Sequence, residues 1–193
     1  GQDSNHIVYG EATAILAGDA LHSLAYEIVV NDPCLSVEHK VNIVKSLSYA
    51  CGFNGMILGH QLDLESEGSD HGDINKIHAL KTGRLISASL ALPITNSELR
   101  IKLKTIGEDI GLAFQIMDDV LESSVSTATL GKDAGSDIKN KKLTYVSVYG
   151  LESAIKTAEE LIDQSKSKII GLDGSFNKNR LIEICDFIIS RDK

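Results

Sequence analysis

Three carboxylates stand close together in the stretch FQIMDDVLE: Asp118, Asp119 and Glu122. On a helix, Gln115 and Glu122 share a face with Asp118, one turn before and one turn after it, and Gly111 leaves room a further turn back. Asp119 lies about 100° around the axis. Carboxylates this close repel one another, and Mg²⁺ would offset the repulsion because it binds carboxylates together with substrate phosphate oxygens. The alternative is a solvated polar face on a surface helix.

A lysine-rich segment follows the acidic stretch. Within eleven residues of an otherwise acidic chain it holds Lys132, Lys139, Lys141 and Lys142. The sequence LGKDAG around Lys132 predicts a flexible backbone. An acidic helix followed by a basic loop is the pattern expected of a metal–diphosphate site, although an ordinary polar loop fits the same pattern.

A second basic position occurs in the tripeptide KTG, at Lys81 and Thr82. A lysine with a neighbouring hydroxyl can hold a phosphate oxygen by charge and by hydrogen bonding. Alone this pair means little, because most Lys-Thr pairs are surface residues.

The elements that must position these residues are helices. The acidic stretch falls in a helix predicted over 96–123, capped by Asn96 or Ser97, with a loop over 124–142. Apolar residues at spacings of four, three and four predict the core-facing stripe of this helix: Ile110, Phe114, Met117 and Leu121.

Helical periodicity runs through the rest of the chain, and the only two prolines are Pro33 and Pro93. We expect a buried helix over 10–30, and over 36–68 one long helix or two, broken near 52–55. A further helix starts at Ile74 and is ended by Pro93. A short helix, an amphipathic helix and a final helix follow over 143–193. The prediction is an all-α protein with a single domain, 1–193.

The amino-acid composition argues against several classes of function. The 193 residues carry a net charge of −8, and the pI is about 5.2. An acidic surface repels nucleic acid and anionic lipid, so neither is expected as the main partner. No apolar run is expected to reach the length of a membrane span, so no membrane insertion is predicted. Three cysteines without a CxxC spacing predict reduced thiols and a cytoplasmic protein.

Taken together, these stretches resemble the trans-isoprenyl diphosphate synthases of the bacterial farnesyl diphosphate synthase (geranyltranstransferase) type. The resemblance covers nearly the whole chain, in the order GEATAILAGDAL, GHQLDLESEG, KTG, FQIMDDVLE and TATLGKDAGSDIKNKKLTY. It implies an all-α helical bundle around a central cavity and a dependence on Mg²⁺. The implied reaction is the condensation of an allylic diphosphate, dimethylallyl or geranyl, with isopentenyl diphosphate in isoprenoid biosynthesis.

The resemblance also implies roles for single residues. Asp118 would ligate Mg²⁺, and Asp119 and Glu122 would orient its waters. Thr82 would line the diphosphate pocket and steady the reacting carbons, so that Asp118, Lys81 and Thr82 form the catalytic set. Four residues would contact the allylic diphosphate: Lys81, Gln115, Lys132 and Lys142.

The chain departs from the family pattern at several positions. Glu122 stands where the second aspartate-rich motif normally ends in aspartate, and His60 stands where glutamine is usual. Lys141 replaces a glycine and Val146 a proline. Glutamate can still reach a metal-bound water, whereas His60 leaves the role of its turn open.

The first aspartate-rich motif of the family has no counterpart in these 193 residues, and by the resemblance it would precede Gly1. We therefore expect this chain to be the C-terminal two-thirds of a longer enzyme and to be inactive alone. The family's dimer interface resembles residues 10–30 and 36–53, so a homodimer is expected.

Two other hypotheses come from different classes of protein. One is a non-catalytic partner subunit of a prenyl diphosphate synthase, which would be expected to lose Asp118 and the phosphate-binding lysines. The other is a helical interaction protein whose acidic helix is only a surface feature. The product's chain length is not set by these residues.

Overall fold

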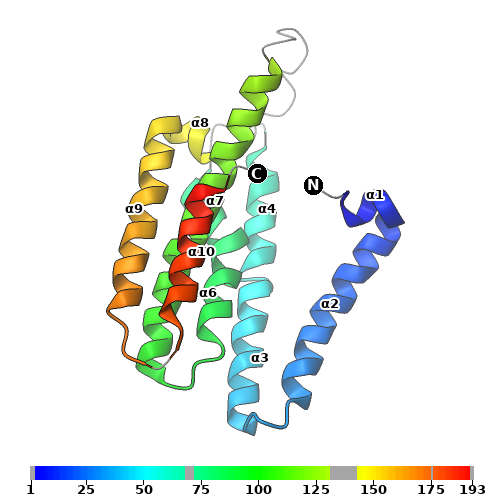
Figure 1. Ribbon diagram of the computed structural model, residues 1–193. Helices are drawn as coiled ribbons and strands as arrows, with labels where there is room; N and C mark the ends of the chain where they lie inside the picture. The colour runs from blue at the N-terminus through cyan, green and yellow to red at the C-terminus, as the bar shows by residue number, and fades with distance from the viewer. Residues whose placement is uncertain (1–2, 68–71, 131–142, 175, 192–193) are drawn as a thin grey trace. The chain divides into compact units, whose positions relative to one another are not determined.

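The computed structural model describes residues 3–67, 72–130, 143–174 and 176–191 (Figure 1). Every regular element in those residues is helical, and no strand occurs among them, so the all-α prediction is confirmed. Two compact units make up the chain, Gly1–Lys45 and Ser46–Lys193. The single domain therefore stays a prediction.

The first unit contains α1 (Asn5–Tyr9), α2 (Glu11–Asn31) and the start of α3 (Val37–Cys51). Gly10 separates the first two helices with φ of +84°, a conformation that favours glycine. The helix α2 ends just before Asp32 and Pro33, because proline disfavours helical geometry in the residue that precedes it.

The helix expected over 10–30 is present as α2, but no residue of α2 is buried. Large apolar side chains such as Ile15, Leu16 and Leu21 are about two-thirds exposed, at 65%, 67% and 67%. The expectation of a buried helix is therefore not met within the first unit, because apolar residues lie all around α2.

The length and composition of α2 also correct the expectation about membrane spans. Its 21 residues, with a mean hydropathy of 1.3 over the most apolar window, are long and apolar enough to cross a membrane. Helices that pack in protein cores and interfaces meet the same criterion. Asp19 lies near the middle of α2, where a charge would be costly in lipid, which favours a protein interface.

The second unit is built around one long helix, α7 (Ser97–Leu130), which contacts most of the others (Figure 1). The other elements are α4 (Met56–Ser66), α5 (Ile74–His78), the π turn η1 (Ala79–Gly83), α6 (Arg84–Ala91), α8 (Tyr145–Tyr149), α9 (Leu151–Ile170) and α10 (Lys178–Ser190). The core of this unit lies where α7 and α9 pack together, and its most deeply buried side chains include Ile106, Ile116, Ile162, Ile169 and Cys185.

Local signals explain several helix ends. The Asn96 side chain accepts a hydrogen bond from the Leu99 nitrogen at 2.9 Å, which confirms Asn96 as the cap of α7. Thr144 caps α8 in a reciprocal capping box with Ser147. Pro93 follows the end of α6, as expected, and the break near 52–55 separates α3 from α4.

Two predictions about α7 need correction. The helix continues to Leu130, so residues 124–130 are helical rather than part of a loop, since no glycine or proline interrupts them. In the predicted core stripe, Ile110 and Met117 are buried but Phe114 and Leu121 are only half-buried. Residues 131–142, which hold the lysine-rich segment, lie outside the described residues.

Candidate active site

Lys81 and Thr82 lie on η1, a π turn between α5 and α6. A π turn inserts an extra residue into a helix and is frequent at functional sites. Two glycines let the neighbouring helices approach it closely. A Cβ on Gly59 of α4 would lie 2.2 Å from the Lys81 nitrogen. A Cβ on Gly111 of α7 would lie 2.6 Å from the Gly83 Cα. The turn is therefore held tightly between α4 and α7.

Both side chains of η1 have partners on those helices. The Lys81 Nζ donates to Asp63 Oδ2 at 2.5 Å, and the two side chains are only 22% and 17% exposed. The Thr82 hydroxyl donates to Gln115 Oε1 at 2.7 Å. The structure thus joins Thr82 to Gln115, two residues that the resemblance assigns to the diphosphate pocket. It also adds Asp63 as the group that orients Lys81.

Asp118 lies one turn beyond Gln115 on α7 and meets a cation from the end of α10. Arg191 Nη2 donates to Asp118 Oδ1 and to the Phe114 carbonyl oxygen, the latter at 2.9 Å. The guanidinium carbon lies 4.0 Å from the centre of the Phe114 ring. Burial raises the pKa of the Asp118 carboxyl above its usual value, and the charge of Arg191 opposes that rise.

Asp119, the next residue, has a different environment. Its side chain is 3% exposed, and Oδ2 accepts a hydrogen bond from the Tyr145 backbone nitrogen at 2.6 Å. The same oxygen lies 3.2 Å from His78 Nε2. Asp119 therefore connects α7 to the first turn of α8 and to the end of α5. An anion at the N-terminus of a helix is favourable because the first backbone N–H groups lack helical partners.

The remaining predicted site residues are Glu122, Lys132 and Lys142. Glu122 is exposed, one turn beyond Asp118. Lys132 and Lys142 lie outside the described residues. Asp63, His78 and Arg191 were not predicted as site residues. Of the three, only Asp63 lies in a stretch that could have indicated it, GHQLD.

The carboxylates of this site suit Mg²⁺ better than a metal that takes all of its ligands from protein side chains. In the described residues no group of three or more His, Cys, Asp or Glu side chains is placed to hold a metal. Mg²⁺ usually keeps several waters and takes one or two carboxylates together with substrate phosphates. The Asp118 side chain is 37% exposed, so a metal that keeps most of its waters can reach it.

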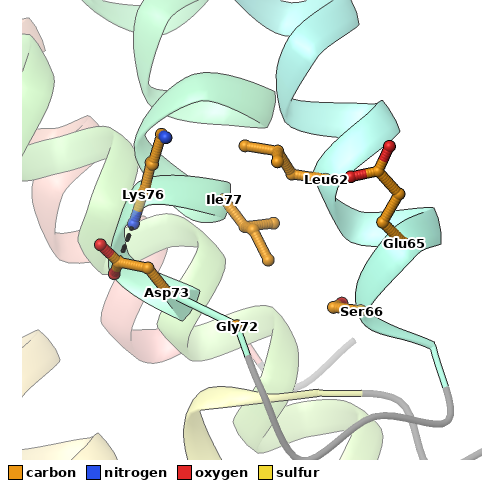
Figure 2. Close-up of a pocket in the computed structure, with 7 residues that line it drawn as sticks. All are labelled: Leu62, Glu65, Ser66, Gly72, Asp73, Lys76 and Ile77. Atoms are coloured by element: carbon orange, nitrogen blue, oxygen red, sulfur yellow. Dashed lines mark hydrogen bonds between the residues drawn. The ribbon is translucent and has the colours of Figure 1, made fainter.

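A cavity of about 290 Å³ lies elsewhere in this unit, between the end of α4 and the start of α5 (Figure 2). Leu62 and Ile77 face one another across the cavity. At the rim of the cavity, the Asp73 carboxylate accepts a hydrogen bond from the Lys76 backbone nitrogen. None of the predicted site residues lines this cavity. This cavity is therefore not lined by Lys81, Thr82, Gln115 or Asp118.

Comparison with known proteins identifies the family to which the chain belongs. The sequence profile of the polyprenyl synthetase family matches residues 1–173, and the chain belongs to that family. The farnesyl diphosphate synthase of Escherichia coli (strain K12) is 38% identical over 198 residues, 97% of this chain and 66% of that protein. The geranylgeranyl diphosphate synthase of Cyanophora paradoxa is 37% identical over 200 residues. It matches 100% of this chain and 66% of its own length. The chain thus spans about two-thirds of such relatives.

Solved structures show the same fold. The crystal structure of the geranyltransferase from Helicobacter pylori 26695 matches with a TM-score of 0.77 at 29% identity, covering 98% of this chain and 64% of that one. A crystal structure of the geranyltransferase from Helicobacter pylori complexed with magnesium and isoprenyl diphosphate matches with a TM-score of 0.75 at 31% identity. It covers 97% of this chain and 63% of that one.

Proposed function

We propose that this chain carries the allylic diphosphate and Mg²⁺ site of a prenyltransferase. The proposed reaction condenses an allylic diphosphate, dimethylallyl or geranyl, with isopentenyl diphosphate in isoprenoid biosynthesis. The observation that carries the proposal is the hydrogen bond from Thr82 to Gln115, which lies one helical turn before Asp118 on α7. Lys81 is the neighbour of Thr82 on η1. The names of the relatives support the reaction class.

In this reaction the allylic C–O bond breaks, diphosphate leaves with the electron pair, the allylic carbon bonds to isopentenyl diphosphate, and a proton is lost. Lys81 would place its ammonium against the diphosphate, oriented by Asp63. The Thr82 hydroxyl holds Gln115 by its oxygen, so that the amide nitrogen points the opposite way, as a donor. Mg²⁺ bound at Asp118 would offset charge on the departing diphosphate.

The other predicted residues enter the proposal with smaller roles. Glu122 would orient metal-bound water, and Lys132 and Lys142 would contact the same diphosphate. If Asp119 orients a metal-bound water, it would do so through Oδ1, because Oδ2 already contacts the Tyr145 backbone nitrogen and His78. We also propose that the protein is a cytoplasmic homodimer. The exposed apolar side chains of α2 support the dimer. The free cysteines among the described residues support the cytoplasmic location.

The proposal concerns the reaction class rather than one product. Similar proteins include both farnesyl and geranylgeranyl diphosphate synthases, so a farnesyl-type product is a prediction from the resemblance. Chain length is decided by how far a growing prenyl tail can extend, and Asp118 and Lys81 act at the opposite, diphosphate end.

Calorimetric titration of the full chain with inorganic diphosphate and Mg²⁺ tests the proposal. Lys81→Gln should weaken binding about tenfold, because a charge-assisted contact is lost, and Asp118→Asn should remove its Mg²⁺ dependence. Lys156→Ala is the control, since Lys156 is 77% exposed on α9 and pairs only with Glu160 among the described residues. Binding that is unchanged in both site variants would contradict the proposal, and absence of binding would favour the non-catalytic subunit.

A further inference from the structure

The end of α10 places a cation on the carboxylate that is proposed to bind metal. Arg191, the residue that follows the last helical position, donates through Nη2 to Asp118 Oδ1 and to the Phe114 carbonyl oxygen. Its side chain is 9% exposed and its guanidinium stacks on the Phe114 ring. Asp118 thus has a positive charge at one of its two carboxylate oxygens.

The contact made by Arg191 is incomplete. Its Nε is buried and has no hydrogen-bond partner in the part of the chain that the structure describes. A buried donor without an acceptor opposes burial of the group that carries it. The ion pair with Asp118 and the stacking on Phe114 must offset that cost, so the net preference of Arg191 for this position is smaller than its contacts alone indicate.

A guanidinium and a divalent cation on one carboxylate repel each other, and the repulsion is strong where the site is partly buried. Asp118 is partly buried, and Arg191 covers its Oδ1. A metal that approaches Asp118 therefore meets both a steric and an electrostatic obstacle at that oxygen.

We propose that Arg191 is a positioning residue of the site: it holds the Asp118 carboxylate in the metal-free protein and competes with Mg²⁺ for it. This inference rests on the proposed function, because it takes Asp118 to be a metal ligand. Its consequence is that metal binding and docking of the end of α10 oppose each other. The coupling is reciprocal: docking of Arg191 weakens metal binding by the same factor by which bound metal weakens that docking. Removing the arginine should therefore tighten metal binding.

The test measures Mn²⁺ binding to the full chain by electron paramagnetic resonance, with Mg²⁺ as competitor. Arg191→Gln should tighten binding about tenfold, within the range usual for coupled sites, and Arg191→Lys should have a smaller effect. Arg180→Gln is the matched control on the same helix, because Arg180 is 77% exposed and pairs with Glu183. Its affinity should equal that of the unmodified chain.

A second readout follows the arginine itself. In the metal-free chain the buried Nε–H of Arg191 should give a protected signal in ¹⁵N NMR, and saturating Mg²⁺ should abolish that protection. If Arg191→Gln fails to fold, judged by circular dichroism, Arg191→Lys and the NMR signal decide the question. Unchanged or weaker Mn²⁺ binding in the Arg191 variants, or a protected signal that persists with metal, would overturn this inference but leave the proposed metal site standing. Absence of metal binding, or binding that survives Asp118→Asn, would overturn both the inference and the proposed metal site.

Discussion

Asp118 and Asp119 are adjacent in the chain, yet the structure separates their environments. Asp118 is 37% exposed and meets Arg191, whereas Asp119 is 3% exposed and bonds to the Tyr145 nitrogen. On a helix, neighbouring residues point in directions about 100° apart, so one can face a site while the other faces the core. The two carboxylates should therefore contribute differently to stability.

Asp119→Ala should lower the free energy of unfolding by about 3 kcal/mol, because it leaves buried groups of Tyr145 and His78 without their acceptor. Asp118→Asn should cost less, about 1 kcal/mol, because Asp118 is 37% exposed and asparagine keeps an oxygen that can accept from Arg191. Urea unfolding followed by circular dichroism measures both. Equal losses in the two variants would show that the carboxylates do not differ in this way.

At the scale of elements, η1 is the part of the fold on which the site depends most. It presents Lys81 and Thr82 to partners on α4 and α7, and both helices approach it at a glycine. A side chain at either glycine would push into the backbone of the turn rather than into a movable side chain. Close packing at these two points therefore determines where the lysine and the hydroxyl lie.

Gly111→Ala should destabilise the chain by about 2 kcal/mol and weaken the contact between Thr82 and Gln115, because overpacking moves η1 away from α7. Gly171→Ala is the matched control, since its Cβ would meet its nearest neighbours at an ordinary 3.6 Å. Thermal unfolding and diphosphate titration give the two readouts. A Gly111→Ala chain as stable as the control, with normal diphosphate affinity, would refute the role assigned to this close approach.

At the scale of the whole molecule, the first unit carries several exposed large apolar side chains. Ile15, Leu16, Leu21 and Ile28 on α2 are each at least 60% exposed. Large exposed apolar patches mark interaction surfaces. A second copy of the chain is the occupant that the family resemblance predicts.

We expect a homodimer or larger assembly at micromolar concentration, measured by light scattering. Leu21→Asp should shift the population toward monomer, because a charge would be buried in the interface. Leu64→Asp, at a residue of α4 that is 62% exposed, is the control for a general effect of added charge. A monomeric unmodified chain would count against this prediction.

The chain alone should not catalyse prenyl condensation. The predicted metal ligands, Asp118, Asp119 and Glu122, all lie on α7, so they would offset the charge of the departing diphosphate from one side only. Partial neutralisation of the leaving diphosphate should cost many powers of ten in rate. Incubation with radiolabelled isopentenyl diphosphate, geranyl diphosphate and Mg²⁺ is the assay, and robust product from this chain would refute the prediction.

The sequence alone determined that the protein is all-helical and where several of its helices begin or end. Helical periodicity, the cap at Asn96 and the stop before Pro33 depend on residues a few positions apart, so they could be predicted locally. The same is true of the face shared by Gln115, Asp118 and Glu122, which follows from helix geometry. The family resemblance rests on the order of such local stretches.

Only the tertiary structure decided which groups meet across helices. Lys81 pairs with Asp63 18 residues away, Asp119 with Tyr145 26 residues away, and Asp118 with Arg191 73 residues away. Periodicity specifies which face of a helix a residue occupies, but it carries no information about which other helix packs there. The π turn at Lys81 and the burial of Asp119 both depend on that packing, and neither could be predicted from local spacing.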